Sequence, residues 1–286
     1  MQGVEFKTST SAGDAVGIEW GAPNGRPVLV IHGWLDHADS FKNLAQLLEP
    51  SLYLKAMDLS GHGKARHAPK GYRYHLMDWV CEVDQLVNVL GWKEFDMIGH
   101  SLGGAIALIY SAVRPGRVKR LVLLDSVGPL NVEPDETASK ARSHLEQWDE
   151  RLPSNRALSL EALIEIRKKS TFTITGSRLS NANAEILVRR AYSQTPQGLV
   201  PAFDPRLKLP SIQSMALGQI LAFLKAVDAS VLLFKAEGGI FREHYGWNER
   251  VSALRSVKSL IVPGDHYVHL SNAPSISQEI NRFLIV

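Results

Sequence analysis

The feature that most constrains this chain is a serine between glycines. Gly99, Ser101 and Gly103 follow a short apolar run at 95–98 and open an apolar helical pattern that reaches about residue 113. In this strand–turn–helix context, a Gly-x-Ser-x-Gly motif presents a nucleophile on a strained turn. Strand and helix pass so closely that the flanking positions tolerate little beyond glycine. The first amides of the helix can face a developing negative charge, so we expect Ser101 to be a nucleophile.

Apolar runs of strand length alternate with helical patterns through the first half of the chain. Residues 4–7 and 16–20, separated by a turn-forming cluster, predict an antiparallel pair. Further strands are predicted at 27–31, 52–57, 95–98, 118–124, 231–234 and 257–262. Continuous apolar runs are typical of strands that are buried on both faces. The alternation therefore predicts an α/β fold with a mostly parallel, doubly wound sheet.

The alternation stops between residues 131 and 228. We expect this stretch to be helical, with no strand that joins the sheet, and to form a cap inserted over the strand ends. The core would then comprise residues 1–130 and 229–286. Helices are predicted at 134–148, 160–171, 181–193 and 212–227.

Ligands of such sheets bind at the carboxyl ends of the strands. The polar residues predicted at these ends are His32, Asp58, Ser101, Asp125 and His266. A serine hydroxyl needs a general base within hydrogen-bond reach and a third group that orients the base. Of the ten histidines, His266 directly follows the last predicted strand, so it is the candidate base.

An oxyanion hole requires two preorganised amides. We expect them from Leu102, directly after the nucleophile, and from Trp34, in the loop after the 27–31 strand. Gly33 would let that loop turn towards the serine, while the Trp34 side chain would form pocket wall. Gly33 and His100 are therefore candidates to line the substrate site. From the expected cap, Arg206 could reach a substrate carboxylate or carbonyl, although a cap-to-core salt bridge is an equal alternative.

Several motifs occur together in a characteristic order: His32-Gly33-Trp34, Asp58-x-x-Gly61-His62-Gly63, Gly99-His100-Ser101-Leu102-Gly103-Gly104 and Gly264-Asp265-His266. With this order the chain resembles the α/β-hydrolase-fold serine hydrolases over essentially its whole length. Within that superfamily it is similar to the serine hydrolase-like proteins, including the run from Asp204 to Ser211. The resemblance implies a carboxylic ester hydrolase with a covalent acyl-enzyme, no metal and no organic cofactor. The alternatives are amide, thioester or carbon–carbon bond cleavage, or small-molecule binding without turnover.

The acid of the triad departs from the common family pattern. In most of the superfamily an Asp follows the penultimate strand, but here that position holds Gly239. Asp125 ends the preceding predicted strand, a placement that some branches, such as haloalkane dehalogenases, use for the acid. Glu237 lies in the usual loop, about two residues early. Asp125 is our preferred acid and Glu237 the alternative.

The charge and the cysteine content limit which partners and which cellular compartment can be expected. A formal net charge of +3 with no basic block gives no indication of a nucleic-acid or membrane-surface partner. Residues 265–269 offer metal-ligand types without completing ligands elsewhere, so no metal site is expected. No apolar run approaches membrane-spanning length and no secretory pattern opens the chain, so we expect a cytoplasmic protein acting on a small ester with a partly apolar acyl group. The single cysteine, Cys81, fits a reducing compartment, and we expect it to pack in the core.

Overall fold

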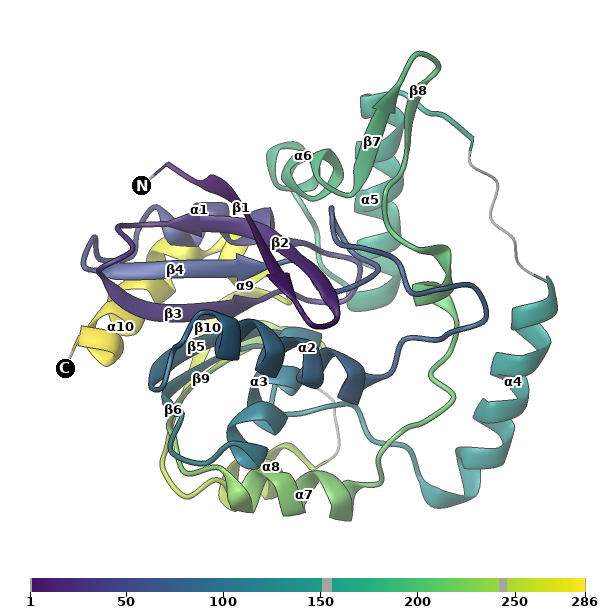
Figure 1. The fold of residues 1–286 in the computed structure, drawn as a ribbon. Helices are drawn as coiled ribbons and strands as arrows, with labels where there is room; N and C mark the ends of the chain where they lie inside the picture. Colours follow the sequence, from purple (N-terminus) through teal and green to yellow (C-terminus); the bar gives the residue numbers. More distant parts are fainter. Residues whose placement is uncertain (1, 151–155, 242–245, 286) are drawn as a thin grey trace.

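An eight-stranded sheet forms the centre of the computed structural model, which describes residues 2–150, 156–241 and 246–285 (Figure 1). The α/β class that the sequence predicts is confirmed. In spatial order the strands are β1 (Val4–Thr10), β2 (Gly13–Trp20), β4 (Leu52–Met57), β3 (Arg26–Ile31), β5 (Phe95–His100), β6 (Val118–Leu124), β9 (Ser230–Gly238) and β10 (Val257–Asp265). β2 pairs antiparallel with β1 and with β4, and the remaining pairings in this sheet are parallel.

Alternate residues of the central strands pack into two separate apolar layers. On β3, Leu29 and Ile31 belong to one layer, and Val28 and Val30 to the other. Helices α2 (Leu76–Val89) and α3 (Leu102–Val113) cover the first layer, while α1 (Lys42–Ala45), α9 (Val268–Ser271) and α10 (Ala273–Ile285) cover the second (Figure 1). Because both faces are covered, every residue of β4 and β5 is buried. This explains why both strands are mostly apolar, although Lys55 and Asp96 are buried with the apolar residues.

The segment between β6 and β9 adds no strand to this sheet within its described residues. It holds α4 (Thr137–Glu150), α5 (Leu160–Thr175), α6 (Asn181–Arg189), β7 (Tyr192–Thr195), β8 (Gly198–Pro201) and α7 (Leu217–Ala226). In Figure 1, α5, α6 and the β7–β8 hairpin stand beyond one end of the sheet, and α4 runs along the outside. Residues 151–155 of the expected cap lie outside the described residues.

Two expectations for this segment are wrong. The helix predicted at 181–193 ends at Arg189, and Tyr192–Thr195 forms the first strand of an antiparallel hairpin. Four-residue strands are too short to show a clear alternation, so the sequence pattern does not distinguish them from the end of a helix. The last helix, α7, begins only at Leu217 and packs against α3 and α8 (Trp247–Ala253). It therefore packs with the core helices, and the cap of residues 131–228 stays a prediction.

Short 3-10 helices complete the described chain at Ala38–Phe41, Pro134–Glu136 and Pro205–Lys208. No helix in the described ranges is long and apolar enough to cross a membrane.

The expectation that Cys81 is buried is also wrong. Helix α2 buries Trp79, Val80 and Val83 against the sheet, and Cys81 is exposed. The helical period explains the error, because a residue one position past the apolar stripe turns away from the core.

Candidate active site

Ser101 lies between β5 and α3 in a left-handed backbone conformation, with φ 51° and ψ −117°. A Cβ atom placed on Gly99 would lie 2.6 Å from the Gly103 carbonyl oxygen, and one on Gly103 would lie 2.1 Å from the Ile31 carbonyl oxygen. Both positions therefore require glycine. The Ser126 hydroxyl donates a hydrogen bond of 2.8 Å to the Ser101 carbonyl oxygen and secures the turn. Ser101 is thus presented on the tight turn that the motif predicts.

His266 follows β10, and the structure places its ring beside Asp125 at the end of β6. Nδ1 of His266 lies 2.6 Å from Oδ2 of Asp125, and both side chains are buried. Because a carboxylate only accepts, His266 must carry its proton on Nδ1, which leaves Nε2 with a free lone pair. The Ser177 hydroxyl, beyond α5, accepts the His266 backbone N–H at 3.1 Å. His266 is therefore oriented as a general base would have to be.

The absence of a side chain at Gly239 leaves room for the Asp125 carboxylate. A Cβ atom on Gly239 would come within 2.3 Å of both carboxylate oxygens of Asp125. The same carboxylate accepts the backbone N–H groups of Ala236 and Ile240, each at 3.1 Å. Asp125 thus fills the pocket that an acid at position 239 would occupy. Glu237 is exposed, so the structure brings Asp125 rather than Glu237 to His266.

The two expected oxyanion donors lie at the same edge of the sheet. Leu102 begins α3, so its N–H has no partner four residues earlier in the helix. Trp34 follows β3, and its indole N–H donates 2.8 Å to the Leu207 carbonyl oxygen, which leaves its side chain as cavity wall. A Cβ atom on Gly33 would lie 2.8 Å from Nδ1 of His100, so only glycine lets this loop lie against the nucleophile turn.

His100 and Arg206, both expected to contact substrate, line the cavity but are bonded within the protein. Nε2 of His100 lies 2.8 Å from the His266 carbonyl oxygen, and burial lowers the His100 pKa well below its usual value. His100 is therefore a neutral donor that supports the backbone of His266. Arg206 donates to Asp204 and to three carbonyl oxygens of residues 68–72. All its N–H groups are directed to the protein. Its ion pair is with Asp204 of the same segment rather than with the core, and its bonds to the carbonyl oxygens of residues 68–72 join it to the core instead.

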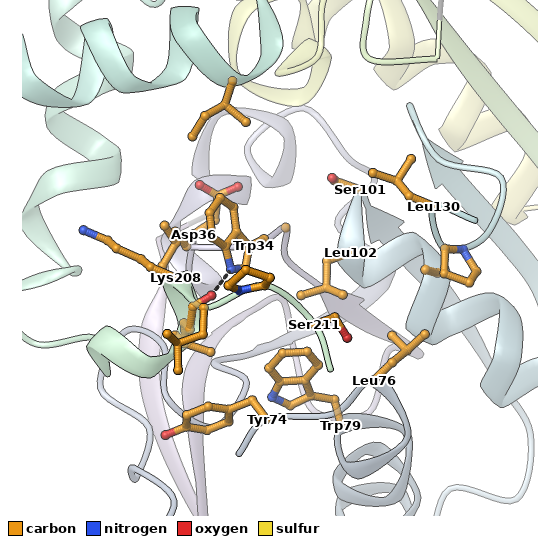
Figure 2. A pocket seen from close by; sticks show the side chains of 18 of the residues that line it. Trp34, Asp36, Tyr74, Leu76, Trp79, Ser101, Leu102, Leu130, Lys208 and Ser211 are labelled. Carbon is orange, nitrogen blue, oxygen red and sulfur yellow. Dashed lines mark hydrogen bonds between the residues drawn. The ribbon is translucent and has the colours of Figure 1, made fainter. Parts of the chain in front are cut away.

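A cavity of about 1290 Å³ opens in front of these groups. In Figure 2, Ser101 lies beside Leu130 and Leu102, while Trp34, Asp36 and Lys208 lie across from it. The apolar and aromatic residues that line the cavity include Leu76, Trp79, Leu102, Leu130, Trp148, Ile166, Ile174, Phe203 and Phe241. A cavity of this size and lining suits an extended, partly apolar small molecule. No group of three or more His, Cys, Asp or Glu side chains within the described ranges is arranged to hold a metal ion.

Comparison with known proteins decides the family. Residues 26–284 match the model of the alpha/beta hydrolase fold family. The chain belongs to the alpha/beta hydrolase fold family. Among its relatives in this family, a serine hydrolase-like protein of Danio rerio is 32% identical over 98% of this chain and 88% of its own length. Serine hydrolase-like protein 2 of Homo sapiens is 33% identical over 98% of this chain and 93% of its own length.

Solved structures agree with this placement among the alpha/beta hydrolases. A hypothetical protein from Pseudomonas aeruginosa PAO1 superposes with a TM-score of 0.86 at 29% identity, covering 99% of this chain and 98% of its own. The thioesterase domain from the curacin biosynthetic pathway shares the fold, with a TM-score of 0.82 at 20% identity over 98% of this chain and 99% of that domain. These likenesses show the alpha/beta hydrolase fold, and the family match together with the serine hydrolase-like relatives indicates a hydrolase.

The sequence did not reveal every residue that supports this alpha/beta hydrolase site. Asp36, two residues after Trp34, is buried at the site, and its place in the loop after β3 was the available signal. Arg167 donates hydrogen bonds to Asp36 and to the Tyr267 hydroxyl. Arg167 lies on a helix whose packing against the core cannot be derived from the sequence. No local pattern could therefore have linked Arg167 to this loop.

Proposed function

We propose that the chain is a serine hydrolase that cleaves carboxylic esters through an acyl-enzyme on Ser101. One observation carries the proposal: the 2.6 Å contact between Asp125 and His266 at the strand edge where the strained serine turn lies. A left-handed backbone conformation is strained for serine, and such strain is typical of the turn that presents an activated nucleophile. The serine hydrolase-like relatives support the same reaction class.

The proposed reaction proceeds in two halves. Ser101 Oγ attacks the ester carbonyl carbon while Nε2 of His266 takes its proton, and the N–H groups of Trp34 and Leu102 hold the oxyanion. His266 then gives that proton to the leaving alcohol as the carbon–oxygen bond breaks. Water attacks the acyl-enzyme, His266 takes the water proton, and its return to Ser101 releases the acid. Throughout, Asp125 keeps the imidazole in one tautomer and stabilises the imidazolium.

In the described residues, no hydrogen bond joins Ser101 Oγ to His266, although both line the cavity. Such bonds often tighten only once substrate is present, so the open geometry is compatible with the proposal. The apolar lining favours an acyl group of several carbons. We propose that the segment between β6 and α7 acts as the cap that shapes this acyl pocket.

The test is a series of p-nitrophenyl esters with two- to eight-carbon acyl groups, measured with the wild type and with Ser101→Ala. We expect hydrolysis in the wild type and loss of at least about a thousandfold in turnover in the variant. A fluorophosphonate probe should label the wild type at Ser101 alone. Unchanged hydrolysis in Ser101→Ala would overturn the nucleophile. Labelling without ester turnover would move the assignment to amide or thioester substrates, and neither labelling nor turnover would favour a binding protein.

A further inference from the structure

Arg167, on α5 of the proposed cap, reaches down to the core and bonds three groups at once. Its Nη1 donates 3.0 Å to the Leu35 carbonyl oxygen. Its Nη2 donates 2.5 Å to Oδ1 of Asp36 and 3.0 Å to the Tyr267 hydroxyl. The side chain is only 15% exposed, and that of Asp36 is 1% exposed. The planar guanidinium suits such a fork, because its donors diverge in fixed directions.

Each partner of Arg167 lies within two residues, along the sequence, of a proposed catalytic group. Leu35 and Asp36 follow Trp34, whose amide is the proposed oxyanion donor, and Tyr267 follows His266. Leu35 is held at φ 58°, a conformation that leucine rarely adopts and that persists only where its surroundings enforce it. The bond from Arg167 to the Leu35 carbonyl oxygen is one such constraint.

A second route leads from the same ion pair to His266. Oδ2 of Asp36 lies 3.7 Å from Nδ1 of His100, and Nε2 of His100 bonds the His266 carbonyl oxygen at 2.8 Å. Burial raises the pKa of Asp36, and the guanidinium of Arg167 opposes that rise. Without Arg167, the carboxyl at the centre of this network would be buried without its counter-charge.

We propose that Arg167 is a positioning residue that couples the cap to both halves of the active site, the oxyanion loop at Trp34 and the turn of His266. The inference rests on the proposed function of Ser101. It assigns to the cap a part in assembling the catalytic groups, in addition to enclosing substrate. Arg167 lines the cavity, but its Nη1 and Nη2 donate to Leu35, Asp36 and Tyr267. We therefore expect it to act on turnover through these partners and to change substrate affinity little.

A second buried ion pair between cap and core provides a matched control. Arg190, at the end of α6, bonds Asp58 at 2.8 Å and Glu5 at 2.8 Å, and its side chain is 6% exposed. Arg190 does not line the cavity, and its carboxylate partners are not neighbours of Trp34 or His266. Its loss should therefore lower stability as the loss of Arg167 does, without reaching the reacting groups.

The experiment compares Arg167→Gln, Arg167→Lys, Tyr267→Phe and Arg190→Gln with the wild type. The readouts are kcat and KM for p-nitrophenyl butyrate, the rate of fluorophosphonate labelling at Ser101, and Tm. We expect Arg167→Gln to lower kcat and the labelling rate by about 30- to 100-fold, since misplacement near 1 Å costs about that much, with KM within twofold. Arg167→Lys should recover only part of the loss, because lysine cannot bond all three partners. Tyr267→Phe should lower kcat about three- to tenfold with Tm near the wild type.

Three results would overturn the inference: kcat unchanged in Arg167→Gln or in Tyr267→Phe, an equal loss of kcat in Arg190→Gln, or a rise in KM alone. If Arg167→Gln does not fold, Tyr267→Phe carries the test, since it removes one hydroxyl. Failure of the proposed ester chemistry would be seen separately, as a wild type that labels at Ser101 without hydrolysing esters. The labelling rates would then still test the role of Arg167.

Discussion

The carboxylate of Asp125 accepts three hydrogen bonds and is wholly buried, which makes Asp125→Asn a sharp perturbation. Oδ2 accepts from His266 Nδ1 at 2.6 Å and from the Ile240 N–H at 3.1 Å, and Oδ1 accepts from the Ala236 N–H at 3.1 Å. An asparagine of the same shape offers one oxygen and one NH2 group. Every neighbouring group is a donor, so one orientation or the other must place donor against donor.

The two orientations fail in different ways. With the NH2 group at the Oδ1 position, the Ala236 N–H loses its acceptor. With the NH2 group at the Oδ2 position, the Ile240 N–H loses its acceptor and His266 must move its proton to Nε2, which removes the base. Either arrangement leaves a buried donor unsatisfied, at a cost of about 1–3 kcal/mol. In both, the imidazolium of the transition state loses its counter-charge.

We therefore expect Asp125→Asn to lower kcat by about 10³- to 10⁴-fold, the upper figure being that of a wrong tautomer. The Tm should fall by about 2–4 °C for each kcal/mol lost. The assay is p-nitrophenyl butyrate hydrolysis with calorimetry on the same samples. Glu237→Gln is the control, and because Glu237 is exposed its kcat should stay within twofold of the wild type. Near-normal turnover in Asp125→Asn with collapse in Glu237→Gln would transfer the role of acid to Glu237.

Two further predictions concern the stability of the fold. Arg206→Ala removes the donors that hold three carbonyl oxygens of residues 68–72, so tryptic cleavage after the exposed Lys70 should accelerate about tenfold; an unchanged rate on gels would refute the anchoring role. Burial lowers the pKa of His269 to about 3, so the unfolded chain binds the extra proton as pH falls below about 6.5, and stability is lost on acidification. His269→Phe should spare about 2 kcal/mol of the loss in unfolding free energy between pH 7 and pH 5, measured by urea titration, and an unaltered pH dependence would contradict this.

Short-range sequence patterns were enough to locate the nucleophile turn and the sheet. The spacing of Gly99, Ser101 and Gly103 is dictated by contacts within one strand–turn–helix unit, so it can be read without knowledge of the rest of the fold. Buried parallel strands are continuous apolar runs, and their order along the chain predicts which residues end at one edge. The order of the strands therefore predicts that His266 lies at the same edge as Ser101.

The hairpin at Tyr192–Thr195 and Gly198–Pro201 shows where such patterns fail. Its strands are too short to establish a period. They are stabilised by hydrogen bonds to each other, which the pattern within either strand does not reveal. The prediction that Cys81 is buried was wrong for a related reason. A shift of one residue along a helix changes the face on which a side chain lies.

The partner of His266 was decided by tertiary structure. Asp125 directly follows β6 and Glu237 lies one residue before the end of β9 in the same sheet, so the sequence left two carboxylates at the same edge. Lateral pairing of β6 with β9 brings the end of β6 beside residue 239, where the missing side chain leaves room for the Asp125 carboxylate. The reach of Arg167 from α5 to the Trp34 loop was decided in the same way. The sequence by itself determined the local turn that presents Ser101, because its constraints are local; packing between distant elements determined what surrounds it, because those contacts join residues more than a hundred positions apart.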